Sequence, residues 1–173
     1  MAVIQLWDPF VRIFHWTIAV VFLANYFIND KGEAAHIALG YLAMALLVMR
    51  VIWGFMSSGA ARWSAVVPTR VAVRKHLQAL VRGNPYRRLG HTPLGSIVMM
   101  TMMACLAGLG VTGVMMTRTD TFWGVEWVKD LHWLVATLLL CLVCLHVLAA
   151  VYESWKLREN LPWSMITGRR RAK

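Results

Sequence analysis

The sequence predicts an all-α fold, namely a transmembrane four-helix bundle with a short amphipathic surface helix between the second and third spans. The first observation is composition: 59% of the 173 residues are hydrophobic and 15% are charged, against about 45–50% and about 25% in average globular proteins. The second is the presence of four long apolar stretches that are almost free of formal charge, the second of them interrupted by Arg50. Backbone amides in lipid must be satisfied within their own segment, so these stretches are expected to be helices rather than strands.

The four spans are expected at 9–29, 34–56, 93–116 and 128–152, within a single domain of residues 1–173. A bilayer-spanning helix needs about 17–25 mostly apolar residues, and all four stretches satisfy this requirement. Asp8 followed by Pro9 predicts the start of the first helix, because aspartate is a good N-cap and proline is favoured at the first helical position.

The segment 57–92 between the second and third spans is too long for a bare connection. Within it, residues 69–82 (TRVAVRKHLQALVR) alternate basic and apolar side chains at helical spacing. This pattern predicts a short amphipathic helix on the membrane surface, with docking of another protein as the alternative. His76, which lies in this helix, is expected to be solvated.

Lysine and arginine are unequally divided between the two sides of the predicted bundle. On one side, the N-terminal segment 1–12 carries one of them, the 57–92 segment seven and the C-terminal segment 153–173 six. The opposite side carries three. Cytoplasmic loops are rich in these residues, so both termini are expected in the cytoplasm and the outer side is expected to be mildly acidic. Membrane topology therefore explains the net charge of +10, and no nucleic-acid partner is expected.

Histidines provide the main functional signal. Four of the six lie in the predicted spans, where ionisable side chains are costly and usually functional. His132 and His146 are 14 residues apart on one predicted helix, which is nearly four full turns, so they share a face and are separated by roughly 21 Å along the axis. Two ligands on one face suggest two cofactors held at two depths.

The directions of the helices assign a partner to each of these two histidines. His15 and His146 are equally far from the inner ends of their helices, and His36 and His132 both lie near outer ends. Two imidazoles per level suit six-coordinate haem iron, whereas closed zinc sites need four ligands. The sequence therefore predicts two haem b groups, with iron ligated by His15 and His146 at the inner level and by His36 and His132 at the outer level.

Covalent haem attachment would require Cys-x-x-Cys-His. The chain has Cys141-Leu-Val-Cys144-Leu-His146, which is one residue too long. We therefore expect the haem to be bound non-covalently and both cysteines to be packing residues.

Aromatic and basic residues gather near the inner ends of the spans. They are candidates for contacts to the anionic haem propionates or to a quinone ring: Arg12, Trp16, Arg50, Trp53, Arg88 and His91. The alternative is that the aromatic side chains form an interfacial belt and the arginines contact lipid headgroups.

Several motifs resemble the prokaryotic cytochrome b561 family, particularly the cytochrome b subunits of nickel–iron hydrogenases. They extend over most of the chain: WDPFVRIFHW at 7–16, HIALG at 36–40, RVIWGF at 50–55, LGHTPLG at 89–95, RENL at 158–161 and MITGR at 165–169, together with His132 and His146. The resemblance implies a four-helix bundle in the bacterial inner membrane with two b haems ligated by helices 1, 2 and 4.

The resemblance also implies transmembrane electron transfer in a respiratory chain. We expect electrons to pass between a periplasmic partner, such as a c-type cytochrome or a hydrogenase-like donor, and membrane quinone, either ubiquinone or menaquinone. One alternative is a superoxide:quinone oxidoreductase without a protein donor, and another is a non-redox scaffold or transporter. The sequence leaves the oligomeric state open, a homodimer included.

Overall fold

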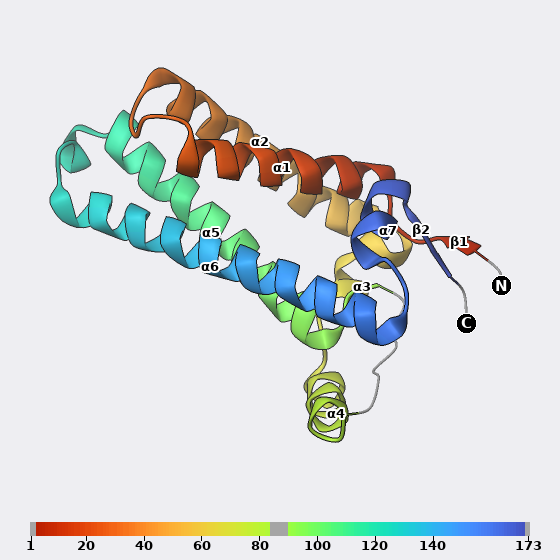
Figure 1. Cartoon of the computed structure of the whole chain (residues 1–173). Coiled ribbons are helices and arrows are strands. Elements are labelled where there is room, and N and C mark those ends of the chain that lie inside the picture. Colours follow the sequence, from red (N-terminus) through yellow and green to blue (C-terminus); the bar gives the residue numbers. More distant parts are fainter. Residues whose placement is uncertain (1–2, 84–89, 172–173) are drawn as a thin grey trace.

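The computed structural model describes residues 3–83 and 90–171. Four long helices run antiparallel to their neighbours in an up-and-down bundle (Figure 1). They are α1 (Pro9–Phe27), α2 (Ala34–Met56), α5 (Pro93–Arg118) and α6 (Glu126–Leu157). All four are long and apolar enough to cross a membrane. The all-α transmembrane bundle predicted from the sequence is therefore confirmed.

Both chain termini lie at one end of this bundle, which we call the proximal end, and the loops 28–33 and 119–125 lie at the other, distal end (Figure 1). Helix α5 packs against α2 and α6, and α2 packs against α1. A buried cluster of Phe22, Cys105 and Leu139 lies midway along the bundle. Many large apolar side chains are exposed on its outer surface, as expected for helices whose solvent is lipid.

The start of α1 follows from local sequence. The Asp8 carboxylate accepts hydrogen bonds from the backbone amides of Phe10 and Val11 at 2.8 and 3.3 Å, and Pro9 occupies the first helical position. These contacts satisfy amides that have no partner within the helix. The predicted N-cap is confirmed.

Two long helices end later than their apolar runs. Helix α5 continues to Arg118, and α6 continues five residues beyond the expected 152, to Leu157. Charged residues end the membrane-compatible stretch, but they do not break a helix. Helix α6 ends only where Arg158 takes a left-handed conformation, with φ of 52°. Conversely, α1 stops at Phe27 rather than at 29.

Between α2 and α5 lie a 3₁₀ turn (Gly59–Ala61), the short helix α3 (Trp63–Val66) and α4 (Arg70–Val81). Helix α4 matches the predicted amphipathic helix, and the Thr69 hydroxyl caps its first turn by accepting from the amide of Ala72. In Figure 1, α4 is seen end-on beside the start of α5, so its axis runs across the long helices. Such an orientation suits a helix that lies in the membrane surface.

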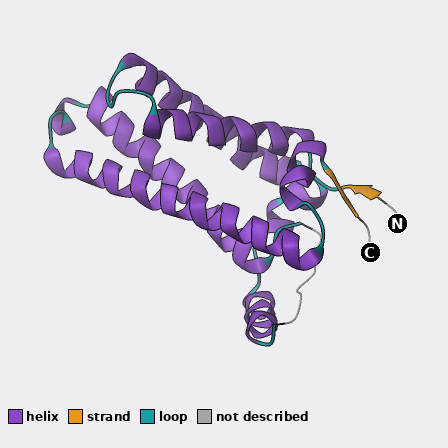
Figure 2. Ribbon diagram, in the orientation of Figure 1, coloured by secondary structure: helices purple, strands orange, loops and turns teal. Residues whose placement is uncertain are grey.

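The proximal end carries a structure that the sequence did not indicate. Strand β1 (Val3–Gln5) pairs antiparallel with β2 (Arg169–Arg171), and α7 (Leu161–Thr167) precedes β2 (Figure 2). We call the segment 158–171 together with β1 the terminal clasp. The indole of Trp7 donates to the Ser164 hydroxyl at 3.2 Å, and the amides of Leu6 and Trp7 both donate to the Gly168 carbonyl.

Candidate functional site

The proximal half of the bundle brings together His15 of α1 and His146 of α6. Their ring centroids are 6.3 Å apart, and the ring planes are tilted by 56°. Both side chains are half-buried. The two rings come from helices that run in opposite directions, at the level where the sequence places both.

The distal half contains a second pair of the same kind. His36 of α2 and His132 of α6 have ring centroids 6.2 Å apart and planes tilted by 58°. Because His132 and His146 are on the continuous helix α6, the two pairs are separated by roughly 21 Å along its axis. Helix α6 thus contributes one imidazole at each level.

Both pairs have the spacing that two imidazoles need to bind one metal ion between them. A metal–imidazole nitrogen bond is about 2 Å long, and this nitrogen lies about 1.2 Å from its ring centre, so two ligands on opposite sides have centroids about 6.4 Å apart. Among the described residues, no three His, Cys, Asp or Glu side chains are placed to hold a metal ion. A pair of imidazoles supplies the two axial ligands of haem iron.

Buried nitrogen atoms in these pairs also fit a bound group. The described residues offer no hydrogen-bond partner to Nδ1 of His15 or Nδ1 of His36, and both atoms are buried. A buried polar atom without a partner is costly and often indicates a redox or ligand-binding role.

Thr112 of α5 is hydrogen-bonded to the His132 ring. The Thr112 hydroxyl donates to the Gly108 carbonyl at 2.7 Å, so its single proton is in use. The same oxygen lies 2.7 Å from His132 Nδ1, and while it donates to Gly108 it can bond the ring only by accepting from Nδ1–H. In that arrangement the proton lies on Nδ1, and Nε2 has a free lone pair for a metal ion. Sequence reasoning missed Thr112, although a polar residue in an apolar span is a usable signal.

Arg50 lies deep in the proximal end of the bundle. Its side chain is 3% exposed; it donates to the Ala61 carbonyl at 3.2 Å and lies 4.7 Å from the centre of the Trp63 ring. Trp63 was not singled out from the sequence. Its indole is held by a hydrogen bond to the Val51 carbonyl at 3.0 Å.

Three buried donor atoms at the proximal end have no partner among the described residues. They are Nη1 of Arg50, Nε of Arg12 and Nε1 of Trp53. Arg12 also donates to the Ile166 carbonyl of the terminal clasp. The rings of Trp53 and Phe10 are 5.2 Å apart, which brings the end of α2 beside the start of α1. Because all three atoms are donors, this region suits an acceptor-rich group such as a carboxylate or a quinone carbonyl.

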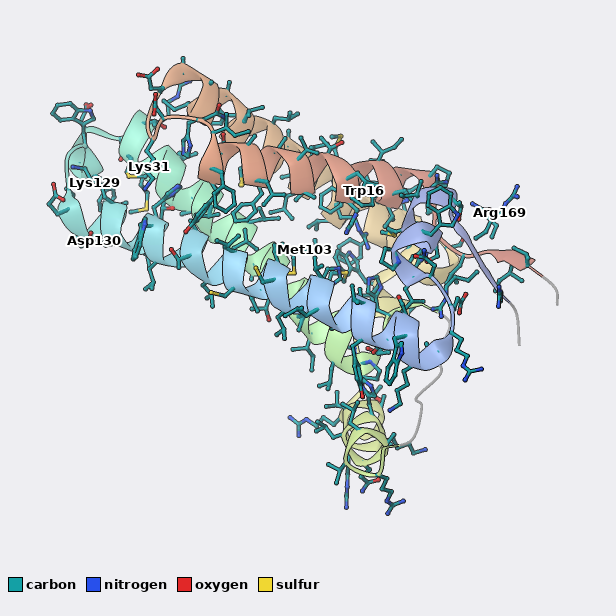
Figure 3. All side chains as sticks on the ribbon, viewed as in Figure 1. Trp16, Lys31, Met103, Lys129, Asp130 and Arg169 are labelled. Atoms are coloured by element: carbon teal, nitrogen blue, oxygen red, sulfur yellow. The ribbon has the colours of Figure 1, made fainter. Side chains whose placement is uncertain are left out.

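The other candidates from the sequence are more dispersed. Trp16, labelled in Figure 3, is 43% exposed. Its ring touches that of His15 edge-on, with centroids 5.1 Å apart. His91 packs against Trp7 at 5.0 Å, on the side of the terminal clasp. Arg88 lies outside the described residues. The five described candidates therefore do not all lie together.

Two expectations about other residues are wrong. His76 is 3% exposed rather than solvated, because α4 is docked on the bundle with this side chain beneath it. Cys141 and Cys144 are exposed on the surface of α6, so they do not pack within the chain. Cys105, by contrast, is part of the buried cluster.

Four spanning helices with imidazoles paired across them define the class of membrane-embedded b-type cytochromes. A family model for prokaryotic cytochrome b561 matches residues 6–168. The chain belongs to this family and is therefore a multi-pass membrane protein that transfers electrons by means of haem b.

Relatives agree with this assignment. The chain is 28% identical to a probable Ni/Fe-hydrogenase B-type cytochrome subunit of Azotobacter vinelandii, over 95% of this chain and 87% of the relative. A protein of the same name from Rhizobium leguminosarum bv. viciae is 27% identical, over 96% and 88%. A third, from Rhodobacter capsulatus, is 23% identical, over 96% and 81%. No solved structure gives a significant match.

Proposed function

We propose that the chain binds two haem b groups, one between His15 and His146 and one between His36 and His132, and conducts electrons along the bundle. The observation that supports this most directly is the pair of imidazole–imidazole contacts, with centroids 6.3 and 6.2 Å apart. Haem supplies an iron atom that alternates between ferric and ferrous states and so carries one electron at a time.

The protein's contribution is to hold the ligands in place and to tune them. Helix α6 holds one imidazole at each level at a fixed separation, and α1 and α2 present the opposing rings. At the distal level the Thr112 hydroxyl, 2.7 Å from Nδ1 of His132, would accept from Nδ1–H and so leave Nε2 to bind the iron. At the proximal level the free donor of Arg12 would stabilise an anionic propionate, as charge-assisted hydrogen bonds do.

We place a quinone at the proximal end. The unpartnered donors of Arg50 and Trp53 support this placement, because quinone carbonyls accept hydrogen bonds and the aromatic side chains offer a stacking surface. Electrons would then enter at the distal haem and leave at the proximal one.

The electron donor would dock at the distal end. In the inner membrane this end would face the periplasm if both termini are cytoplasmic. Figure 3 labels Lys31, Lys129 and Asp130 there, and acidic residues slightly outnumber basic ones in this region. A mildly acidic face would suit a partner with a basic patch. The names of the relatives support a hydrogenase-type donor.

Haem stoichiometry and single substitutions test the proposal. Purified protein should contain two haem b per chain by pyridine haemochrome assay, and a stable ratio near one would contradict the two-level arrangement. His15→Ala and His146→Ala should remove the same spectral and redox component, and His36→Ala and His132→Ala should remove the other. His76→Gln is the control that should retain both. If His15→Ala behaved like His132→Ala, the pairing would be wrong.

The position of the quinone is tested separately. Quinol-driven reduction of each haem should slow at least tenfold in Arg50→Gln, because the shorter, neutral side chain no longer brings a charged donor to the quinone carbonyl. The control is Arg118→Gln at the distal end. A normal rate in Arg50→Gln together with a slow rate in Arg118→Gln would place the quinone at the distal end and reverse the direction of electron flow.

A further inference from the structure

We infer that a groove between α4 and the start of α5 binds an anionic phospholipid. The groove has a volume of about 420 Å³ and is lined by Pro68, Arg70, Val73, Arg74, Leu77 and Ile97. This site is separate from the histidine pairs, and the inference does not depend on the proposed haem or quinone sites.

Helical geometry places four of the lining residues on the same side of α4. Positions 70, 73, 74 and 77 are spaced i, i+3, i+4 and i+7, so they form one stripe along α4. This stripe lies where the polar and apolar faces of the helix meet. Buried His76 keeps a different face of α4 against the bundle, which leaves the stripe open toward α5.

Charge favours an anion in the groove. Arg70 and Arg74 are one turn apart, and α4 (RVAVRKHLQALV) contains no acidic residue. Like charges at i and i+4 destabilise a helix, and no described residue forms an ion pair with either arginine. A phosphate between the two guanidinium groups would remove this repulsion with charge-assisted hydrogen bonds. Figure 3 shows nitrogen-bearing side chains projecting outward from α4.

Depth favours a lipid over a soluble anion. Helix α5 has 26 residues and is therefore about 39 Å long, against a hydrocarbon thickness of about 30 Å. If the excess is shared between both ends, the first three residues of α5 lie among the headgroups. Ile97, the fifth residue, then lies at the hydrocarbon boundary.

The outer surface of α5 provides a path for an acyl chain. Ile97 is 41% exposed and Met100 is 38% exposed, and Ala104 continues the same exposed side. The arginines would hold the phosphate, Val73 and Leu77 would cover the glycerol region, and the acyl chain would descend along α5. The inner and outer leaflets of a bacterial membrane both contain such lipids, so the inference holds for either orientation of the chain.

Native mass spectrometry of the full chain in detergent tests the site, with phosphatidylglycerol and phosphatidylcholine of identical acyl chains as probes. Wild type should retain one phosphatidylglycerol at collision energies that remove phosphatidylcholine. Each arginine near an anionic lipid contributes about fivefold in affinity, so the double variant Arg70→Gln/Arg74→Gln should bind phosphatidylglycerol about 25-fold more weakly. Arg74→Glu alone should weaken binding at least as much as one Gln substitution.

Lys75→Gln is the matched control, because Lys75 is an exposed cation on the same helix outside the groove. It should change binding by less than about threefold. An equal loss in Lys75→Gln would show diffuse attraction to the basic helix and would overturn the site. Displacement of the lipid by millimolar glycerol 3-phosphate, or equal retention of the two lipids by wild type, would overturn it as well. Unchanged thermal unfolding of each variant establishes that it is folded.

Discussion

The hydroxyl of Thr112 offers a direct way to test how the chain tunes the proposed distal haem. An acceptor on Nδ1–H increases the basicity of the imidazole ligand and so favours ferric iron. Thr112→Val keeps the shape of the side chain and removes the acceptor. We predict that the midpoint potential of the distal haem rises by about 30–60 mV, which corresponds to a three- to tenfold shift in the redox equilibrium. Spectroelectrochemical titration measures this change.

Thr112→Ser should restore the wild-type potential, because serine retains the hydroxyl. Thr101→Val is the matched control: this residue is exposed on the same helix, and among the described residues its hydroxyl bonds only to the Ile97 carbonyl, at 3.0 Å. A wild-type potential in Thr112→Val, with two haems present, would show that the hydroxyl does not act on the iron through His132.

The burial of a second residue, His76, leads us to predict that the stability of the folded chain depends on pH. Burial, with a smaller effect of the nearby Lys156, lowers the pKa of His76 below its ordinary value of 6.5. The unfolded chain therefore binds an additional proton below about pH 6.5, and the folded state loses stability as pH falls through this range. Proteolysis of the 57–92 segment should be faster at pH 5.5 than at pH 8. In His76→Gln this contribution should vanish, and an unchanged pH dependence would contradict the prediction.

Among the secondary-structure elements, the sequence predicts those whose signal is local. The four spans follow from apolar length, and α4 from its alternation of basic and apolar residues. The end of α6 at Leu157 could not be predicted from hydropathy, because the boundary of the lipid and the end of a helix are set by different forces. Strands β1 and β2 were missed because three-residue strands carry little pattern, and their pairing joins positions far apart in the sequence.

The terminal clasp contains a buried ion pair whose removal should be costly. Arg170 donates to both carboxylate oxygens of Glu159 at 3.0 and 3.3 Å, and the two side chains are only 4% and 8% exposed. Glu159→Gln leaves the guanidinium buried without this counter-charge, and breaking a buried pair costs about 3–5 kcal/mol. We predict a loss of about 3 kcal/mol in the stability of the clasp, measured as faster proteolysis of the 158–171 segment.

The matched control is the exposed pair Lys129–Glu126, whose side chains are 51% and 78% exposed. Glu126→Gln should cost less than about 1 kcal/mol, because water screens an exposed pair. If both variants were cleaved at the wild-type rate, the clasp would not depend on the buried pair.

At the scale of the whole molecule, helix direction was sufficient to predict which histidines would meet. His15 is six residues from the start of α1 at Pro9, and His146 is six residues from 152, the predicted inner end of the fourth span, so both lie at one depth if the two spans cross the same bilayer. Helix α6 itself continues to Leu157, so the count applies to the predicted membrane boundary and not to the end of the helix. The surroundings of Arg50 could not be predicted in this way. Trp63, which covers Arg50, begins the short helix α3 after α2, and its position depends on tertiary packing.

The orientation of the whole chain is a further prediction. The proximal side carries most of the lysines and arginines, so it should remain in the cytoplasm. Green fluorescent protein fused after residue 173 should fluoresce, and alkaline phosphatase at the same position should be at least tenfold less active than when inserted in the 119–125 loop. Active phosphatase at the C-terminus with inactive phosphatase in this loop would reverse the orientation.

The pairing of β1 with β2 also constrains the order of events during synthesis. Strand β1 leaves the ribosome before any of the spans, and β2 follows all of them. At about 5–20 residues per second, β1 waits roughly 10–30 s for its partner. Both proposed haem sites also require α6, which is made after α1, α2 and α5. Cofactor insertion and closure of the proximal end therefore follow the synthesis of α6 and β2, when those three helices have already entered the membrane.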